Sequence, residues 1–311
     1  MNLSVSVIIP VYNERENIVS TCQELLSALK GISDIGEIQL IIVDDHSSDN
    51  VDEVISQIRD ARKTYLRLSR RSGSHVALRA GMAHVTGDAC LCVSADGQED
   101  LSCLKDMLSK WRGRAAIVWA LRKKREEPWY IRKPAQAFYR FIFWSTGITS
   151  GGIDLSRADF FLLDRKVIEA VNKCPERNTS LFGLIAYIGF VQDFVEYNRR
   201  PRRLGESKWS LRRRIRLAKD WIIAFSGLPL KMIFFLGLFI ALSGFLYIIH
   251  VIINAVIGTP APGWSSMMAV ILFIGGVQMI MLGVVGEYLW RNLDESRKRP
   301  LYFIERKIDE Y

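Results

Sequence analysis

The chain lacks the glycine-rich signatures that hold phosphate groups in many nucleotide-binding proteins. Neither a GxGxxG nor a GxxxxGK[ST] motif follows the first apolar run, which excludes the dinucleotide fingerprint and the P-loop. The chain also has no internal repeat, and its five cysteines show no spacing typical of a metal site. Any phosphate must therefore be held by something other than a glycine cradle, and the cysteines are expected to stay reduced.

Charge is nearly absent from two apolar segments near the C-terminal end. Residues 232–257 and 267–290 each exceed the about 20 helical residues that cross a bilayer core, so both predict membrane-spanning helices. The short link at 258–264 carries no charge, whereas arginine and lysine crowd both outer flanks and supply most of the net charge of +9. The positive-inside rule then predicts a multi-pass protein of the inner cell membrane with both flanks in the cytoplasm. The first residues also lack the basic start and apolar core of a signal peptide, so the N-terminal region is expected to be cytosolic.

Two further segments mix aromatic with basic side chains. Residues 128–145 and 209–225 fit helices that lie in the membrane interface, with aromatic rings at headgroup depth and basic side chains reaching toward water. The alternative is an ordinary core helix with basic edges.

Short β-branched runs alternate with helix-length amphipathic segments over the first part of the chain. This alternation predicts an α/β domain with a mostly parallel sheet covered by helices on both faces. The expected strands are Val5–Pro10, Ile38–Val43, Tyr65–Leu68, Ala89–Ser94 and Ala115–Ala120, and the expected helices are Glu14–Lys30, Asp52–Arg59, His75–His84 and Leu101–Trp111. The polar segments after the first four strands, at 10–14, 44–50, 69–75 and 94–100, should share one rim, where such sheets bind ligands.

Five motifs together resemble one family. They are VIIPVYNERENI, IIVDDHSSDN, SADGQED, ADFFLLDRK and RRLGESKW, at residues 7–18, 41–50, 94–100, 158–166 and 202–209. In order and spacing they resemble family-2 glycosyltransferases of the polyprenyl-phosphate type, which include dolichyl-phosphate mannose synthase and bacterial bactoprenol glucosyltransferases. The resemblance implies a GT-A fold that transfers a sugar, with inversion, from a nucleotide-diphosphate donor to polyprenyl phosphate at the cytoplasmic face of the membrane. UDP-glucose and undecaprenyl phosphate are the expected substrates.

The same resemblance predicts the organisation of the chain. We expect a GT-A domain at 1–205, an amphipathic interface helix at 206–228, a transmembrane hairpin at 229–292 and a cytoplasmic basic tail at 293–311. The expected partners are the donor, the lipid acceptor and the membrane, with no nucleic acid, and the paired spans are compatible with a homo-oligomer.

The first two motifs match the nucleotide pocket of the family. Pro10, Tyr12 and Glu14 would supply a fixed turn, an aromatic wall and a carboxylate that accepts hydrogen bonds from a base or ribose. Val43 and Asp45 match the contribution of the second strand to the same pocket.

The third motif corresponds to the metal-binding Asp-x-Asp of the family. Asp96 and Gln98 offer hard oxygen ligands for Mg²⁺ or Mn²⁺, which would bridge the donor phosphates and make Asp96 a catalytic residue. Ser94 takes the place of the first aspartate, so the site has one negative charge fewer and should hold its ion less tightly.

Helix capping is the alternative explanation for two polar clusters. Residues 48–50 precede the helix expected near Asp52, and for these we favour capping over ligand binding. Residues 96–100 could likewise form only a turn and cap the helix expected at Leu101.

The remaining motifs match the phosphate and acceptor side. Arg122, Arg202 and Lys208 match basic residues that hold phosphate oxygens. Asp159 matches the catalytic-site aspartate beside the acceptor, where we expect it first to orient acceptor or sugar and only second to act as a base.

Two departures from the family leave other functions open. His46 replaces a usual glycine, and Phe161 replaces an arginine that bacterial relatives often carry. Together with Ser94, Phe161 makes a catalytically weak nucleotide-sugar binder an alternative. A polysaccharide synthase is a further alternative, although the QxxRW-type motif of that class is missing.

Overall fold

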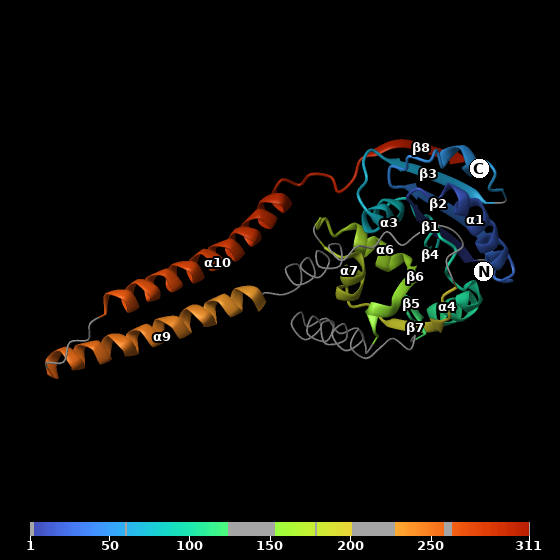
Figure 1. The fold of residues 1–311 in the computed structure, drawn as a ribbon. Helices are drawn as coiled ribbons and strands as arrows, with labels where there is room; N and C mark the ends of the chain where they lie inside the picture. Colours follow the sequence, from blue (N-terminus) through green and yellow to red (C-terminus); the bar gives the residue numbers. More distant parts are fainter. Residues whose placement is uncertain are drawn as a thin grey trace.

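The computed structural model describes residues 3–59, 61–123, 153–177, 179–200, 228–257 and 263–310. Within these residues, a sheet domain carries a long two-helix hairpin that extends away from it (Figure 1). The two segments predicted as interface helices, at 128–145 and 209–225, lie outside the described residues.

Within the described residues, the sheet has eight strands in the order β7-β5-β6-β4-β1-β2-β3-β8. In chain order these are β1 (Leu3–Val11), β2 (Ile35–Asp44), β3 (Arg62–Leu68), β4 (Ala89–Cys92), β5 (Ile117–Arg122), β6 (Ala158–Asp164), β7 (Gln192–Tyr197) and β8 (Ile304–Glu310). Only β6 and β8 run against the others, since β6 pairs antiparallel with β4 and β5, and β8 pairs antiparallel with β3. The prediction of a mostly parallel sheet is therefore confirmed.

Helices cover both faces of this sheet. One face carries α1 (Arg15–Lys30), α2 (Asp52–Ile55) and α4 (Leu104–Arg112), which follows the short 3-10 helix η1 (Leu101–Cys103). The other carries α3 (Ser74–Met82), α6 (Arg165–Asn172) and α7 (Leu181–Tyr187), while a second 3-10 turn, η2 (Leu155–Arg157), leads into β6.

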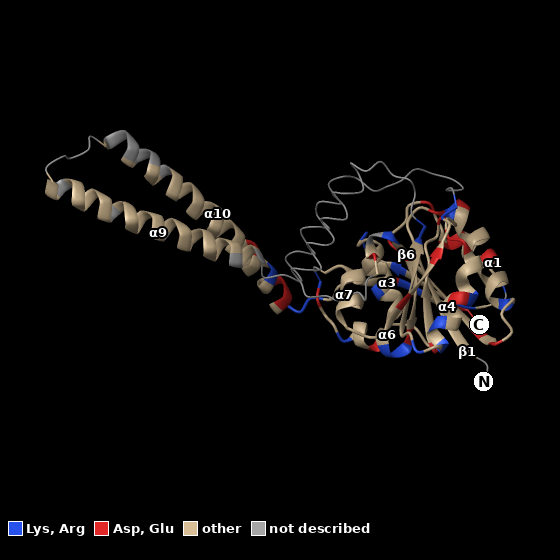
Figure 2. Cartoon of the chain, turned by 90° about the horizontal axis from the view of Figure 1, so that it is seen from below, with Lys and Arg blue, Asp and Glu red and all other residues tan. Residues whose placement is uncertain are grey.

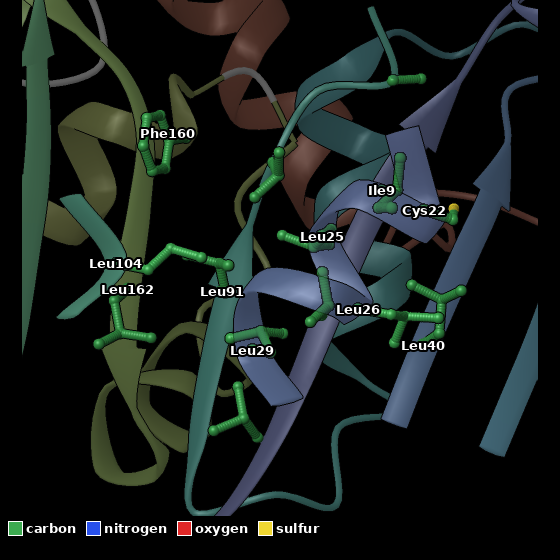
Figure 3. Close-up of a cluster of buried hydrophobic side chains, with 14 of the residues drawn as sticks. Ile9, Cys22, Leu25, Leu26, Leu29, Leu40, Leu91, Leu104, Phe160 and Leu162 are labelled. Atoms are coloured by element: carbon green, nitrogen blue, oxygen red, sulfur yellow. The ribbon is translucent and has the colours of Figure 1, made fainter. Parts of the chain in front are cut away.

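Strand periodicity explains the two cores. Because successive side chains of a strand point to opposite faces, Val7 and Ile9 of β1 enter one core and Ile8 enters the other. Figure 3 shows the first core, where Leu25 and Leu29 of α1 lie over Leu91 of β4. This packing holds the strand ends, and therefore the loops that follow them at one edge of the sheet, in fixed positions.

The hairpin consists of α9 (Leu228–Ile257) and α10 (Trp264–Ser296). Both are long and apolar enough to cross a membrane by length and composition. Their large apolar side chains are exposed, as for Phe234 at 65%, Phe239 at 68% and Ile280 at 70%. Charged residues are scarce along the hairpin and gather at the end of α10 nearest the sheet domain (Figure 2). An exposed apolar surface of this extent is typical of a segment that contacts lipid or another protein.

After α10 the chain returns to the sheet. Residues 304–310 belong to the segment expected to be a basic tail, but they form strand β8 along the edge strand β3 (Figure 1). Tyr302, just before β8, packs against the second core. The C-terminal segment is thus an integral part of the sheet domain.

Candidate active site

The sheet topology brings the sequence-predicted segments to one rim. The carboxyl ends of β1, β2, β3, β4, β5 and β7 lie there, because these strands run in the same direction. β6 and β8 run in the opposite direction, so their first residues lie at the same rim. Asp159, the second residue of β6, therefore lies on the same side of the sheet as the predicted nucleotide and metal turns.

The loop after β1 presents Tyr12 and Glu14. Pro10 pairs with Val43 in the parallel register of β1 and β2, so the two predicted pocket residues are neighbours. The guanidinium carbon of Arg71 lies 3.7 Å from the centre of the Tyr12 ring. Glu14 is the N-cap residue of α1, and its Oε2 accepts a 2.8 Å hydrogen bond from the side-chain amide Nδ2 of Asn17. A planar aromatic group with a cation and a carboxylate nearby can bind a nucleobase, ribose or phosphate.

Asp45 joins the β2 end to the loop after β3. Its carboxylate accepts backbone hydrogen bonds from Ser72 at 2.5 Å and Gly73 at 2.8 Å. Burial raises the pKa of Asp45, while the two backbone N–H groups and Arg71 act in the opposite direction. The backbone N–H of Asp45 also donates to the Val11 oxygen at 2.8 Å, so Asp45 connects the end of β1, just before Tyr12, to the loop that carries Arg71.

Asp44, which the sequence reading passed over, stabilises the same turn from within. It is fully buried, and its carboxylate accepts hydrogen bonds from the Ser47 backbone at 2.7 Å, the Tyr65 hydroxyl at 2.8 Å and Arg67 at 2.7 Å. Burial and the bond to Asp44 raise the pKa of Tyr65, so this hydroxyl stays protonated and remains a donor.

The capping interpretation of residues 48–50 is wrong for α2. The N-cap residue of α2 is Val51, and no side chain caps this helix. Asp49 instead accepts a 2.9 Å hydrogen bond from the backbone N–H of Arg15, at the start of α1. Capping does occur at the second cluster, where Asp100 accepts a 3.2 Å bond from Ser102 in η1.

The turn after β4 contains the predicted metal ligands. Ser94 Oγ donates to Asp96 Oδ1 at 2.6 Å, and the amide oxygen of Gln98 accepts a hydrogen bond from Arg199. Gly97 between them has a φ of 64°, a left-handed conformation that glycine adopts without steric cost.

The atoms of this turn that could ligate a metal decide which ion it can bind. Within the described part of the chain, no three acidic, histidine or cysteine side chains gather around one point. Asp96, Gln98 and the Ser94 hydroxyl are hard oxygen donors, and an amide oxygen has two lone pairs, so Arg199 does not exhaust Gln98. These residues fit a divalent ion that takes its remaining ligands from a bound diphosphate.

Glu99 adds a buried carboxyl behind this turn. Its Oε1 lies in hydrogen-bond contact with Ser94 Oγ, and its Oε2 has no hydrogen-bond partner within the described part of the chain. Burial raises the pKa of Glu99 to about 7, and the nearby Asp96 carboxylate adds to this rise. A carboxyl that holds its proton near neutrality can donate to the Ser94 hydroxyl, which then donates to Asp96.

Asp159 lies among basic groups. Its carboxylate is 3.0 Å from Arg122 Nε and 3.8 Å from Arg199 Nη1, and it accepts a hydrogen bond from the Tyr197 hydroxyl. Burial, followed by the negative Asp159, raises the pKa of Tyr197, so the tyrosine remains a donor. An aspartate engaged by two guanidinium groups and a hydroxyl is better suited to orient charged groups than to remove a proton.

Three residues singled out from the sequence, Arg202, Lys208 and Phe161, are not found at the rim in the described part of the structure. Arg202 and Lys208 lie outside the described residues. Phe161 is a core residue, 1% exposed, with its ring 5.3 Å from those of Trp119 and Phe182. The side chain of Phe161 therefore contributes to the packing of β6 in the second core.

Arg71, Glu99, Tyr197 and Arg199 were not singled out from the sequence. Arg71 and Glu99 lie in polar segments predicted to reach the rim. Their location at the rim could therefore be predicted from the sequence, but their contacts could not. Tyr197 is the last residue of β7 and Arg199 follows this strand, which is missing from the predicted set.

The sheet order, the helices on both faces and the polar rim define a GT-A fold. A solved structure, the mannosyl-3-phosphoglycerate synthase from Rubrobacter xylanophilus, superposes with a TM-score of 0.51 at 16% identity, covering 71% of this chain and 72% of that chain. At this identity the likeness concerns the fold alone.

The chain belongs to glycosyltransferase family 2. The model described as "Glycosyl transferase family 2" matches residues 6–170, and the model "GtrB C-terminal hairpin" matches residues 228–291. An uncharacterized glycosyltransferase of Synechocystis is 37% identical over 98% of this chain and 95% of its own length. A bactoprenol glucosyl transferase of Shigella phage SfX is 34% identical over 97% of this chain and 99% of its own length. The prediction of a family-2 glycosyltransferase with a GT-A fold is confirmed, and the chain is a glycosyltransferase.

Proposed function

We propose that this glycosyltransferase moves a sugar from a nucleoside-diphosphate donor, with UDP-glucose favoured, to polyprenyl phosphate, with undecaprenyl phosphate as the favoured lipid. The observation that carries the proposal is the combination of a polar rim with an apolar hairpin in one chain. Full-length similarity to bactoprenol glucosyl transferases supports the same lipid class. The basic flanks of the hairpin favour a catalytic domain on the cytoplasmic side of the membrane.

In this proposal the nucleotide binds between the loops after β1, β2 and β3. Tyr12 and Arg71 would contact the base or ribose, and Glu14 and Asp45 would accept hydrogen bonds from nucleotide N–H or hydroxyl groups. Pro10 and Val43 would form the floor beneath them. The carboxyl ends of neighbouring parallel strands are the usual ligand site of such sheets, which supports this placement.

The diphosphate would extend toward the turn after β4. Asp96 and Gln98 would hold Mg²⁺ or Mn²⁺, which when bound neutralises negative charge on the phosphates as the nucleotide leaves. Arg122 would contribute a planar donor fork to phosphate oxygens. Arg202 and Lys208 remain predicted phosphate ligands on the motif that contains them.

The acceptor needs little activation by the protein. A phosphate monoester has a second pKa near 6, so it is largely ionised at pH 7 and is already nucleophilic. Asp159 would hold Arg122 and Arg199 so that their guanidinium groups face the acceptor phosphate or the transferred sugar. Inversion then requires the acceptor oxygen to approach the anomeric carbon from the face opposite the leaving diphosphate.

A transfer assay with the full chain tests the proposal. The purified protein in liposomes would receive undecaprenyl phosphate and one of several radiolabelled nucleotide sugars, with Asp96→Asn as the inactive control. Label in the extracted lipid, dependent on undecaprenyl phosphate and largest with UDP-glucose, is expected. Label in a polymer would instead indicate a polysaccharide synthase, and donor binding without transfer a catalytically weak binder.

A further inference from the structure

The first residues of β8 lie beside the proposed nucleotide site. β8 runs antiparallel to β3 and pairs Ile304 with Leu68, at the rim end of β3. Glu305 therefore reaches the rim from a segment far away in sequence, whereas Glu310 lies at the other end of the strand, where it forms a 2.6 Å ion pair with Lys63.

Arg67 of β3 connects Glu305 to the turn after β2. Its Nε donates to Glu305 Oε2 at 3.1 Å, and its Nη1 donates to Asp44 Oδ2 at 2.7 Å. Its Nη2 donates to the backbone oxygen of Ser47 at 3.0 Å. One guanidinium group thus fixes both ends of the turn that contains Asp45, and Glu305 fixes the orientation of that group.

The turn after β2 is also hydrogen-bonded to the loop after β1. Ser47 Oγ accepts a 3.0 Å hydrogen bond from the Asn13 backbone, and Asn13 Oδ1 accepts a 2.8 Å bond from the Ser48 backbone. Asn13 lies between Tyr12 and Glu14, so a displacement of the turn would displace both proposed nucleotide contacts.

His46 lies within the same turn and has a left-handed backbone with a φ of 61°. Its Nδ1 is 3.2 Å from the backbone oxygen of Leu68 and 3.7 Å from Glu305 Oε2. Glu305 therefore contacts the turn through both Arg67 and His46.

The segment between the hairpin and β8 is held at both ends. Arg177 of the sheet domain forms a 3.2 Å ion pair with Asp294 near the end of α10, and its backbone donates to Glu295 at 2.8 Å. At the other end, the Ser69 backbone donates to the Phe303 oxygen at 2.9 Å. The end of the hairpin and the beginning of β8 are thus both attached to the domain that carries the rim.

We propose that Glu305 is a positioning residue of the donor site, through which the C-terminal strand holds the nucleotide-binding turn in its binding conformation. The inference rests on the proposed nucleotide site and extends it to a residue beyond the hairpin. Glu305 acts through Arg67 and His46 and does not itself contact the substrates. Through Glu305, the segment that follows the membrane hairpin contributes to the affinity of the protein for its donor.

Calorimetric titration of the full-length protein with UDP and with GDP, each with Mg²⁺, tests this proposal. Glu305→Gln should weaken nucleotide binding by about two- to fivefold, the effect of losing a partly exposed ion pair that orients a ligand-binding turn. Glu305→Lys should weaken it further because it places a cation against Arg67, and Glu305→Asp should recover part of the loss. Glu310→Gln and Glu310→Lys, at the far end of the same strand, are matched controls that should bind like the wild type.

Kinetics and thermal unfolding separate positioning from general stability. The Glu305 variants should raise the KM for the donor with little change in kcat, while their unfolding midpoints resemble those of the matched Glu310 variants. Equal nucleotide affinity of wild type and the Glu305 variants would overturn the inference, as would an equal loss in the Glu310 variants. If the wild type binds neither nucleotide, the proposed function fails, and the inference fails with it.

Discussion

Replacing Ser94 with aspartate probes the turn that we assign to the metal. The Ser94 hydroxyl donates to Asp96 at 2.6 Å and contacts Glu99, so Ser94→Asp removes a donor and adds a third carboxylate. Two like charges about 4 Å apart repel by about 4 kcal/mol at an effective dielectric constant of ~20. Because a protonated Glu99 can donate a hydrogen bond to the new carboxylate and offset part of its repulsion from Asp96, we expect a net cost of only about 1–2 kcal/mol near pH 7, or roughly 2–8 °C in Tm without metal.

With a divalent ion and donor present, the sign of the effect should reverse. The added carboxylate is a hard ligand, and we expect the Mn²⁺ concentration for half-maximal transfer to fall about tenfold, which corresponds to ~1.4 kcal/mol. The value of kcat need not rise, because tighter ground-state binding does not by itself stabilise the transition state.

The assay is a Mn²⁺ titration at fixed donor, read both as sugar transfer and as Tm. Ser109→Asp, on the exposed surface of α4, controls for the added charge, and Asp96→Asn for the loss of the main ligand. We expect Asp96→Asn to abolish transfer. An unchanged metal midpoint for Ser94→Asp, or undiminished turnover for Asp96→Asn, would show that the ion binds elsewhere.

Three further predictions concern pH, the acceptor side and the C-terminal strand. The pKa of Glu99 is raised by burial from its ordinary 4.5 to about 7, so its contribution to stability is full below pH 4.5 and is lost as the pH rises to about 7. In urea unfolding, the free energy of unfolding of the wild type should therefore fall by up to about 3 kcal/mol over this window relative to that of Glu99→Gln. Parallel curves of unfolding free energy against pH for the two proteins would contradict this. Asp159→Asn should lower kcat about tenfold or more by releasing Arg122 and Arg199, but the residual activity should keep the wild-type pH profile; loss of the decline in activity at low pH would instead identify Asp159 as a base. Ending the chain after Leu228 removes β8, so this truncation should unfold at lower temperature than a chain whose residues 228–296 are replaced by a flexible linker, and equal midpoints would contradict this. Both should lose transfer to long-chain acceptor.

Local sequence pattern was sufficient for the elements whose signal is contained in one segment. The β-branched runs at β1 and β2 bury every second side chain in each core, and the two apolar stretches of the hairpin, residues 232–257 and 267–290, contain only one charged residue, Glu287. The rim could also be predicted, because parallel strands place the residues that follow them at one edge. Asp45 and Asp96 were therefore located on the rim by their strand ends, whereas Asp159 was assigned by its motif and its place on the rim follows from the direction of β6.

The sequence by itself thus determined the α/β class, the hairpin and the residue types of the rim, because periodicity, length and charge are local properties. Only the tertiary structure decided which of these residues meet. β8, with the sequence IERKIDE, has too few apolar residues to show a core-facing period, as is common for charged edge strands. Its antiparallel register brings Glu305 to Arg67, and the register of β6 and β7 brings Tyr197 and Arg199 to Asp159. Such pairings depend on the order and direction of strands far apart in the chain, which no local pattern encodes.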